Sequence, residues 1–93
     1  MTAEKRTKFQ IYFDILEALS DELRNDSMLQ PTKVAHRVNL PYDRFRSYLD
    51  YLMQVGMVSS KPDGGLAVTE KGVEYLKEHG RHRDFLRLMG LLS

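Results

Sequence analysis

The amino-acid sequence predicts a mainly α-helical domain with one small β-hairpin, an α+β fold. Three observations lead to this prediction. Apolar residues recur at helical spacing through most of the chain, a proline separates two of the helical stretches, and a turn rich in proline, aspartate and glycine joins two short apolar stretches. With 93 residues, of which 42% are hydrophobic and 29% charged, the chain suits one globular domain.

The first predicted helix covers about residues 5 to 23. Its broad buried face is a stripe of apolar side chains that recur every three or four residues, Phe9, Tyr12, Leu16, Leu19 and Leu23, widened by Ile11, Ile15 and Ala18. A polar segment from Arg24 to Ser27 ends this helix. Pro31 then suits the first turn of a short second helix, where its missing N–H costs nothing. The second helix has a small apolar side, formed by Val34, Ala35 and Val38.

A turn around Asn39 separates the second helix from a third, predicted over about residues 42 to 55. Pro41 fixes its own φ and disfavours helix at Leu40, so the chain has to break there. The apolar side of the third helix comprises Tyr42, Phe45, Tyr48, Leu49, Leu52 and Met53. Gly56 stands where a left-handed residue commonly ends a helix.

Residues 57–60 and 66–68 are two short predicted strands, and the turn between them supplies the φ values that a hairpin requires. Thr69 is suited to cap a fourth helix, which Gly80 is expected to interrupt. The sequence therefore predicts a winged helix-turn-helix with an additional C-terminal helix. Residues 1–80 form the winged domain, and residues 81–93 form a helix that either covers the core or makes a dimer.

The C-terminal segment carries an apolar stripe at the spacing i, i+3, i+4 and i+7, formed by Phe85, Leu88, Met89 and Leu92. Such a stripe is either a flap over the domain's own core or half of a dimer interface. A domain of this size rarely needs so much apolar surface in a terminal segment, and a symmetric dimer matches palindromic DNA sites. We therefore expect a homodimer.

The formal net charge is only +1. A strongly basic domain would have indicated a polyanionic partner, and this chain lacks that signature. The absence of cysteine excludes disulfides and thiolate metal sites. No apolar run approaches the roughly 20 residues needed to span a bilayer, and no secretion signal is apparent. A cytoplasmic protein without a membrane partner is expected.

The residue pattern does not predict an enzyme. His36, His79 and His82 are the only histidines, and no carboxylate-plus-histidine set with metal-ligand spacing accompanies them. Neither a nucleophile elbow nor a phosphate-binding loop is present. We expect no catalytic residue, metal, cofactor or small-molecule ligand.

The third helix is the expected recognition helix, which enters the DNA major groove. Arginine can bond guanine O6 and N7 together, a contact worth about 1–3 kcal/mol of base discrimination. Basic residues of the second helix and the wing would contact phosphates, whereas aspartates on the third helix are unfavourable beside them. The predicted DNA-binding residues are Lys33, Arg37, Asp43, Arg44, Arg46, Ser47, Tyr51 and Lys61.

Several short motifs occur in a characteristic order. They are Asn39-Leu40-Pro41-Tyr42, Tyr48-Leu49 with Leu52, and Leu66-Ala67-Val68-Thr69-Glu70-Lys71-Gly72. In this order and spacing they resemble the small archaeal winged-helix DNA-binding transcriptional regulators over roughly residues 9 to 78. The resemblance implies a winged-helix fold, double-stranded DNA as the partner and, often, dimerisation through a C-terminal helix.

A second class of function stays open at this point. The near-neutral charge and the acidic first helix would also suit a winged helix that serves as a protein–protein interaction module without direct DNA binding. A continuous positive face around Arg44 and Lys61 would favour DNA, and scattered charge would favour a protein partner.

Overall fold

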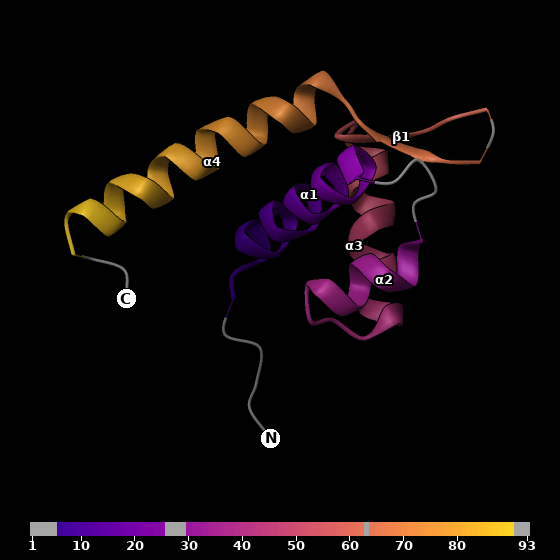
Figure 1. Ribbon diagram of the computed structural model, residues 1–93, viewed down its shortest axis with the longest axis horizontal. Coiled ribbons are helices and arrows are strands. Elements are labelled where there is room, and N and C mark those ends of the chain that lie inside the picture. Colours follow the sequence, from indigo (N-terminus) through magenta and orange to yellow (C-terminus); the bar gives the residue numbers. More distant parts are fainter. Residues whose placement is uncertain (1–5, 26–29, 63, 91–93) are drawn as a thin grey trace.

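The computed structural model describes residues 6–25, 30–62 and 64–90. These residues form four helices and a two-stranded antiparallel hairpin (Figure 1), which confirms the predicted α+β fold. In chain order the elements are α1 (Lys8–Asn25), α2 (Pro31–Arg37), α3 (Tyr42–Gln54), β1 (Val58–Ser60), β2 (Leu66–Val68) and α4 (Glu70–Leu88).

The helix α1 lies at the centre of the molecule and contacts α2, α3, α4 and β2 (Figure 1). The central core combines α1 residues with buried residues of the other elements: Ile11, Ile15, Leu16, Ala18, Leu19, Val34, Ala35, Val38, Leu40, Phe45, Leu49, Leu52 and Val58. Phe13, which the predicted stripe did not include, is also buried. It lies outside this cluster, against α4. The position of α1 therefore requires buried side chains on more than one of its faces.

A tight turn joins α2 to α3. Asn39 adopts a φ of 64°, in the left-handed region that asparagine tolerates better than most residues. The Leu40 N–H donates to the carbonyl of Ala35 at 3.0 Å. Pro41 takes the N-cap position of α3, so the helix begins at Tyr42 as predicted. Because Leu40 is buried, the turn is anchored in the core and fixes where α3 starts.

The end of α3, the hairpin and the start of α4 are joined by Thr69. Its hydroxyl donates to the carbonyl of Gly56 at 2.6 Å and accepts from the N–H of Gly72 at 3.2 Å. Gly56 has a φ of 83°, which confirms the predicted left-handed residue after α3. In the hairpin, Val58 pairs with Val68. The wing is therefore held at both of its ends.

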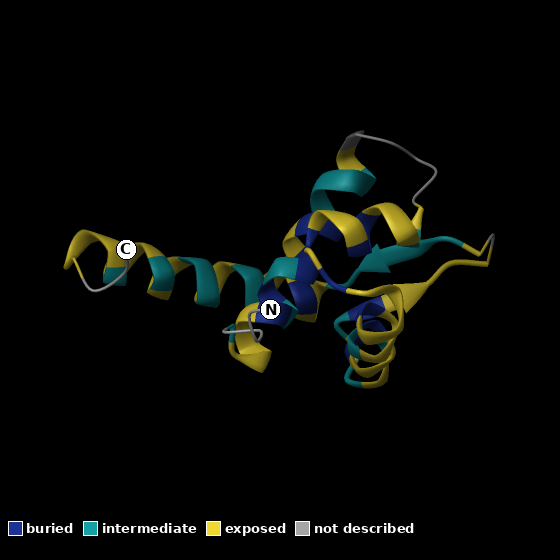
Figure 2. Ribbon diagram, turned by 90° about the horizontal axis from the view of Figure 1, so that it is seen from below, coloured by how far each residue is buried: buried dark blue, intermediate teal, exposed yellow. Residues whose placement is uncertain are grey.

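The helix α4 runs without interruption to Leu88, so the predicted break at Gly80 is wrong. A glycine inside a helix costs only about 1 kcal/mol relative to alanine, and here Gly80 lies against the ring of Phe13. The last turns of α4 project beyond the rest of the molecule (Figure 2). The division of the chain into residues 1–80 and 81–93 stays a prediction, because it concerns what the projecting part does.

Two aromatic residues predicted for the core are exposed. Phe9 is 66% exposed and Tyr42 is 44% exposed, so these predictions were wrong. Both lie in the first turn of their helices, and the aromatic neighbours of their rings belong to the same helix, Tyr12 for Phe9 and Phe45 for Tyr42. Tyr12, Tyr48 and Met53 do pack against the core.

His79 holds α4 against α1. Its imidazole stacks on the Phe13 ring, with centroids 4.9 Å apart, and on the Tyr75 ring, at 5.6 Å. Burial lowers the pKa of His79, and the nearby charges of Arg83 and His82 lower it further, whereas Asp14 acts in the opposite direction. Protonation of His79 is therefore less favourable in the folded protein than in the unfolded chain.

We expect acidification to destabilise the protein through His79. A histidine pKa that is lowered by folding contributes stability above about pH 6.5, the ordinary value, and this contribution is lost as the pH falls towards the folded pKa. Urea denaturation at pH 7.5 and 5.5 measures the loss. His79→Phe keeps an aromatic ring between Phe13 and Tyr75 without a titrating group, so its loss should be smaller. An equal loss in both proteins would contradict this assignment.

Candidate nucleic-acid interface

The helix α3 presents a polar face to solvent. Phe45, Leu49 and Leu52 are buried on one side. The residues on the opposite side are all exposed: Asp43, Ser47, Asp50 and Gln54. The Ser47 hydroxyl donates to the carbonyl of Asp43 at 3.2 Å, which occupies its hydrogen within the helix. One face of α3 is thus fixed in the core, and the other is free to meet a partner.

The two arginines of α3 lie on its opposite flanks and have different neighbours. The Arg44 guanidinium lies 6.0 Å from the centre of the Tyr48 ring and donates to the Tyr48 hydroxyl at 3.5 Å. Arg46 forms an ion pair with Asp50, in which Nε and Oδ1 are 3.3 Å apart. Both arginines are exposed. Their positive charges are balanced along the helix by Asp43 and Asp50, so α3 itself carries little net charge.

Tyr51 is about half exposed, but its ring does not stand free. It stacks on Tyr12 of α1, with ring centroids 5.3 Å apart and planes 20° apart. Tyr48 meets the same Tyr12 ring edge-on at 5.5 Å. Burial raises the pKa of Tyr12, with smaller contributions from Tyr51 and Tyr48. This stacking limits the freedom of Tyr51 to reach a base, a constraint that helical spacing within α3 alone did not indicate.

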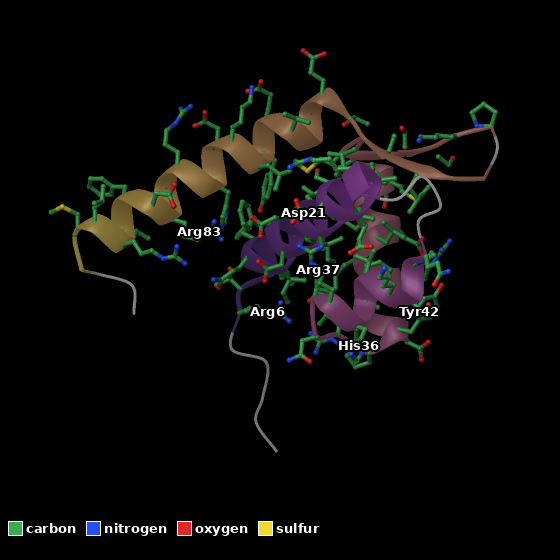
Figure 3. All side chains as sticks on the ribbon, in the orientation of Figure 1. Arg6, Asp21, His36, Arg37, Tyr42 and Arg83 are labelled. Carbon is green, nitrogen blue, oxygen red and sulfur yellow. The ribbon has the colours of Figure 1, made fainter. Side chains whose placement is uncertain are left out.

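Arg37 of α2 points towards the acidic end of α1 (Figure 3). It donates to Asp21 Oδ2 at 2.6 Å and to Glu22 Oε2 at 3.1 Å. These two hydrogen bonds raise the pKa of the Arg37 guanidinium. Lys33 lies 3.5 Å from Glu22 Oε1. The two residues predicted as phosphate contacts are therefore paired across the α1–α2 junction, and a phosphate would have to compete with these carboxylates.

The remaining predicted residues occupy the wing and the C-terminal helix. Lys61 follows β1 and is exposed, and its N–H donates to the carbonyl of Gly65 at 2.7 Å. Phe85, Leu88 and Met89 are exposed at the projecting end of α4, with Leu88 87% exposed. Leu92 lies outside the described residues. Among the described residues, nothing covers the apolar patch, defined as Phe85, Leu88 and Met89.

The sequence did not predict a hydrogen bond that connects the C-terminal end of α3 to α4. The Lys71 ammonium donates to the carbonyl of Val55 at 2.7 Å, where the α3 C-terminus carries a partial negative charge. Lys71 and Val55 are 16 residues apart, and no short-range pattern connects them. This contact joins the C-terminal end of α3 to α4.

Other kinds of site find little support in the described part of the chain. No group of three or more histidine, cysteine, aspartate or glutamate side chains gathers there as a metal site would require. Within the same residues, no helix is both long enough and apolar enough to cross a membrane. The surface that distinguishes this fold is the exposed face of α3, a helix that also contacts the wing strand β1.

A helix pair joined by a tight turn, an exposed second helix and a following hairpin define a winged helix-turn-helix protein, a class in which this arrangement generally binds DNA. The chain belongs to the winged helix-turn-helix family, whose sequence pattern matches residues 5–87. It is also similar to an uncharacterized protein of the archaeon Methanocaldococcus jannaschii, with 35% identity over 68 residues. That match covers 73% of this chain and 29% of the relative.

Proposed function

We propose that the protein is a sequence-specific DNA-binding transcriptional regulator. The observation that carries this proposal is the placement of α3, whose apolar side is buried while its polar side is exposed, and which contacts the first strand of the wing. Membership of the winged helix-turn-helix family supports DNA as the partner. In this proposal, α3 enters the major groove and its N-terminal half reads base edges.

The proposed phosphate contacts come from basic side chains on the wing and on α2, the elements that adjoin α3. Lys61 extends from the wing, and Lys33 is mostly exposed even though it lies near Glu22. Arg37 is tied more firmly to Asp21 and Glu22. We therefore assign the stronger phosphate contacts to Lys61 and Lys33, and a weaker one to Arg37, which has to exchange its carboxylate partners for a phosphate.

A homodimer completes the proposal. The apolar patch of Phe85, Leu88 and Met89 lies at the projecting end of α4. Pairing two copies of this patch removes apolar surface from water, which is favourable by about 25 cal/mol per Å². It also doubles the number of positive contacts on one DNA duplex. A two-fold dimer would read a palindromic site with its half-sites about one helical turn apart.

Selection from a pool of random duplex DNA at two salt concentrations tests these proposals together. Enrichment of a palindromic motif, with affinity that falls steeply as salt rises, would support a dimeric sequence reader that also contacts phosphates. Enrichment of a motif without symmetry would contradict the dimer alone. No retention of DNA at low salt would contradict DNA binding and would favour a protein-interaction module.

We expect Arg44→Ala and Arg46→Ala to weaken binding to the selected DNA. Each removes a side chain that can contact a base edge, and loss of one such contact should lower affinity roughly 5- to 150-fold, equivalent to about 1–3 kcal/mol. Arg81→Ala is the matched control, because Arg81 is an exposed arginine on α4 that pairs with Glu78. Titration of labelled DNA gives the affinities. If both α3 variants bind as tightly as the control, this placement of α3 is wrong.

A further inference from the structure

Two aspartates on the exposed face of α3 need an explanation if this face binds DNA. Asp43 and Asp50 both carry negative charge towards the proposed partner. A carboxylate beside phosphates lowers affinity, because like charges repel most strongly where docking has removed water. A useful role for an aspartate at such a position would therefore be something other than raising affinity. The two aspartates differ in their surroundings, because Asp50 forms an ion pair with Arg46 and Asp43 does not.

The carboxylate of Asp50 engages one particular atom of Arg46. Its Oδ1 lies 3.3 Å from Nε, the nitrogen within the side chain. The guanidinium has five N–H donors in a planar fork, and four of them are on the two terminal nitrogens. Among the described residues, the terminal nitrogens of Arg46 form no hydrogen bond. The ion pair thus leaves free the two nitrogens that can bond guanine O6 and N7 together.

Helix geometry also determines the direction in which Asp50 draws Arg46. Successive residues are about 100° apart around an α-helix. Arg46 follows the buried Phe45 and therefore lies on a flank of α3, whereas Asp50 lies closer to the middle of the exposed face. An ion pair from Arg46 to Asp50 moves the guanidinium from the flank towards the surface that would meet the groove.

We infer that Asp50 is a positioning residue for Arg46 and makes α3 selective for guanine at one base pair. This inference rests on the proposed DNA-binding function. In the free protein the pair is exposed and contributes little to stability. When the interface closes and water leaves, the interaction between the two charges strengthens. The guanidinium is then held in one orientation, and its fork fits guanine better than the other bases.

Asp43 supplies the matched control. It lies on the same face of the same helix and carries the same charge. Its backbone carbonyl accepts a hydrogen bond from Ser47, and no ion pair of its carboxylate is present among the described residues. Removal of either aspartate lowers the negative charge of the face equally. Only the removal of Asp50 breaks the ion pair with Arg46. A comparison of the two substitutions therefore distinguishes the effect of lost negative charge from the effect of lost Arg46 orientation.

The test compares base preference in selection from random duplex DNA. Arg46→Ala first identifies the base pair that Arg46 reads, as the position where a guanine preference disappears. At that base pair, Asp50→Ala should lower the preference at least about fivefold, while its affinity for unrelated DNA stays equal or rises. Asp43→Ala should increase affinity for unrelated DNA and keep the guanine preference at this one base pair, whatever it changes at base pairs that Asp43 itself faces. Asp50→Glu, which restores a carboxylate, should recover most of the preference.

Each other outcome overturns a defined statement. If the unaltered protein binds a specific motif and Asp50→Ala keeps the full guanine preference, the positioning role is wrong and the DNA-binding function stands. The same conclusion follows if Arg46→Ala changes no base preference, or if Asp43→Ala loses it equally. If the unaltered protein binds no duplex DNA at low salt, the proposed function itself fails, and the role of Asp50 fails with it.

Discussion

Replacement of Phe13 by alanine should destabilise the protein by about 3–5 kcal/mol, the range typical for a buried phenylalanine. Phe13 is only 3% exposed. His79 stacks on its ring, and the Arg83 guanidinium lies 4.7 Å from the ring centre. Removal of the ring leaves a cavity between α1 and α4 and deprives both α4 side chains of one of their contacts. Since whole domains are stable by about 5–15 kcal/mol, urea denaturation should detect the loss readily.

Phe9→Ala is the matched control for this prediction. It makes the same chemical change on the same helix, four residues away, but Phe9 is largely exposed and its nearest aromatic neighbour, Tyr12, is 6.5 Å away. A surface substitution of this kind usually changes stability by less than about 0.5 kcal/mol. Equal losses in the two variants would show that α4 does not depend on Phe13 for its attachment to α1.

The sequence predicted the elements well because each has a local cause. Pro41 precedes the first residue of α3, Gly56 and Thr69 mark the limits of α3 and α4, and all three lie where they were expected. Phe13 was missed for a different reason. A search for one apolar stripe finds one buried face, whereas α1 is covered on several sides. How many neighbours a central helix has is decided by the tertiary arrangement.

The position of the candidate interface could be predicted from the sequence, but the ion pairs of its charged residues could not. Helical spacing correctly placed Arg44, Arg46 and Asp50 on exposed parts of α3. It gave no indication that Arg37 would bond Asp21 and Glu22, because these partners are 16 and 15 residues away. Long-range ion pairs depend on how α2 packs on α1. They determine which charges are available to a ligand, so a list of basic residues overstates the positive surface.

Gly72→Ala should destabilise the protein, by about 1–3 kcal/mol, although alanine is the better helix former. Gly72 is buried in the first turn of α4. A Cβ at this position would lie 2.5 Å from the carbonyl oxygen of Met57 and 2.7 Å from Cγ1 of Val68. The Met57 carbonyl also accepts the N–H of Thr69, so it cannot move without loss of that bond. Relief of the clash would displace α4 from the wing.

Gly80→Ala, in the same helix, should have the opposite sign. A Cβ there would lie 3.7 Å from the nearest atom of the Phe13 ring, an ordinary van der Waals contact. Replacement of an interior helical glycine by alanine then stabilises by up to about 1 kcal/mol. Thermal or urea unfolding of the two variants measures both effects. If both stabilise, the start of α4 is not pressed against the wing; if both destabilise, α4 is not a regular helix at residue 80. Opposite signs would establish that only one of these two glycines is required by packing, because the helix itself would favour alanine at both.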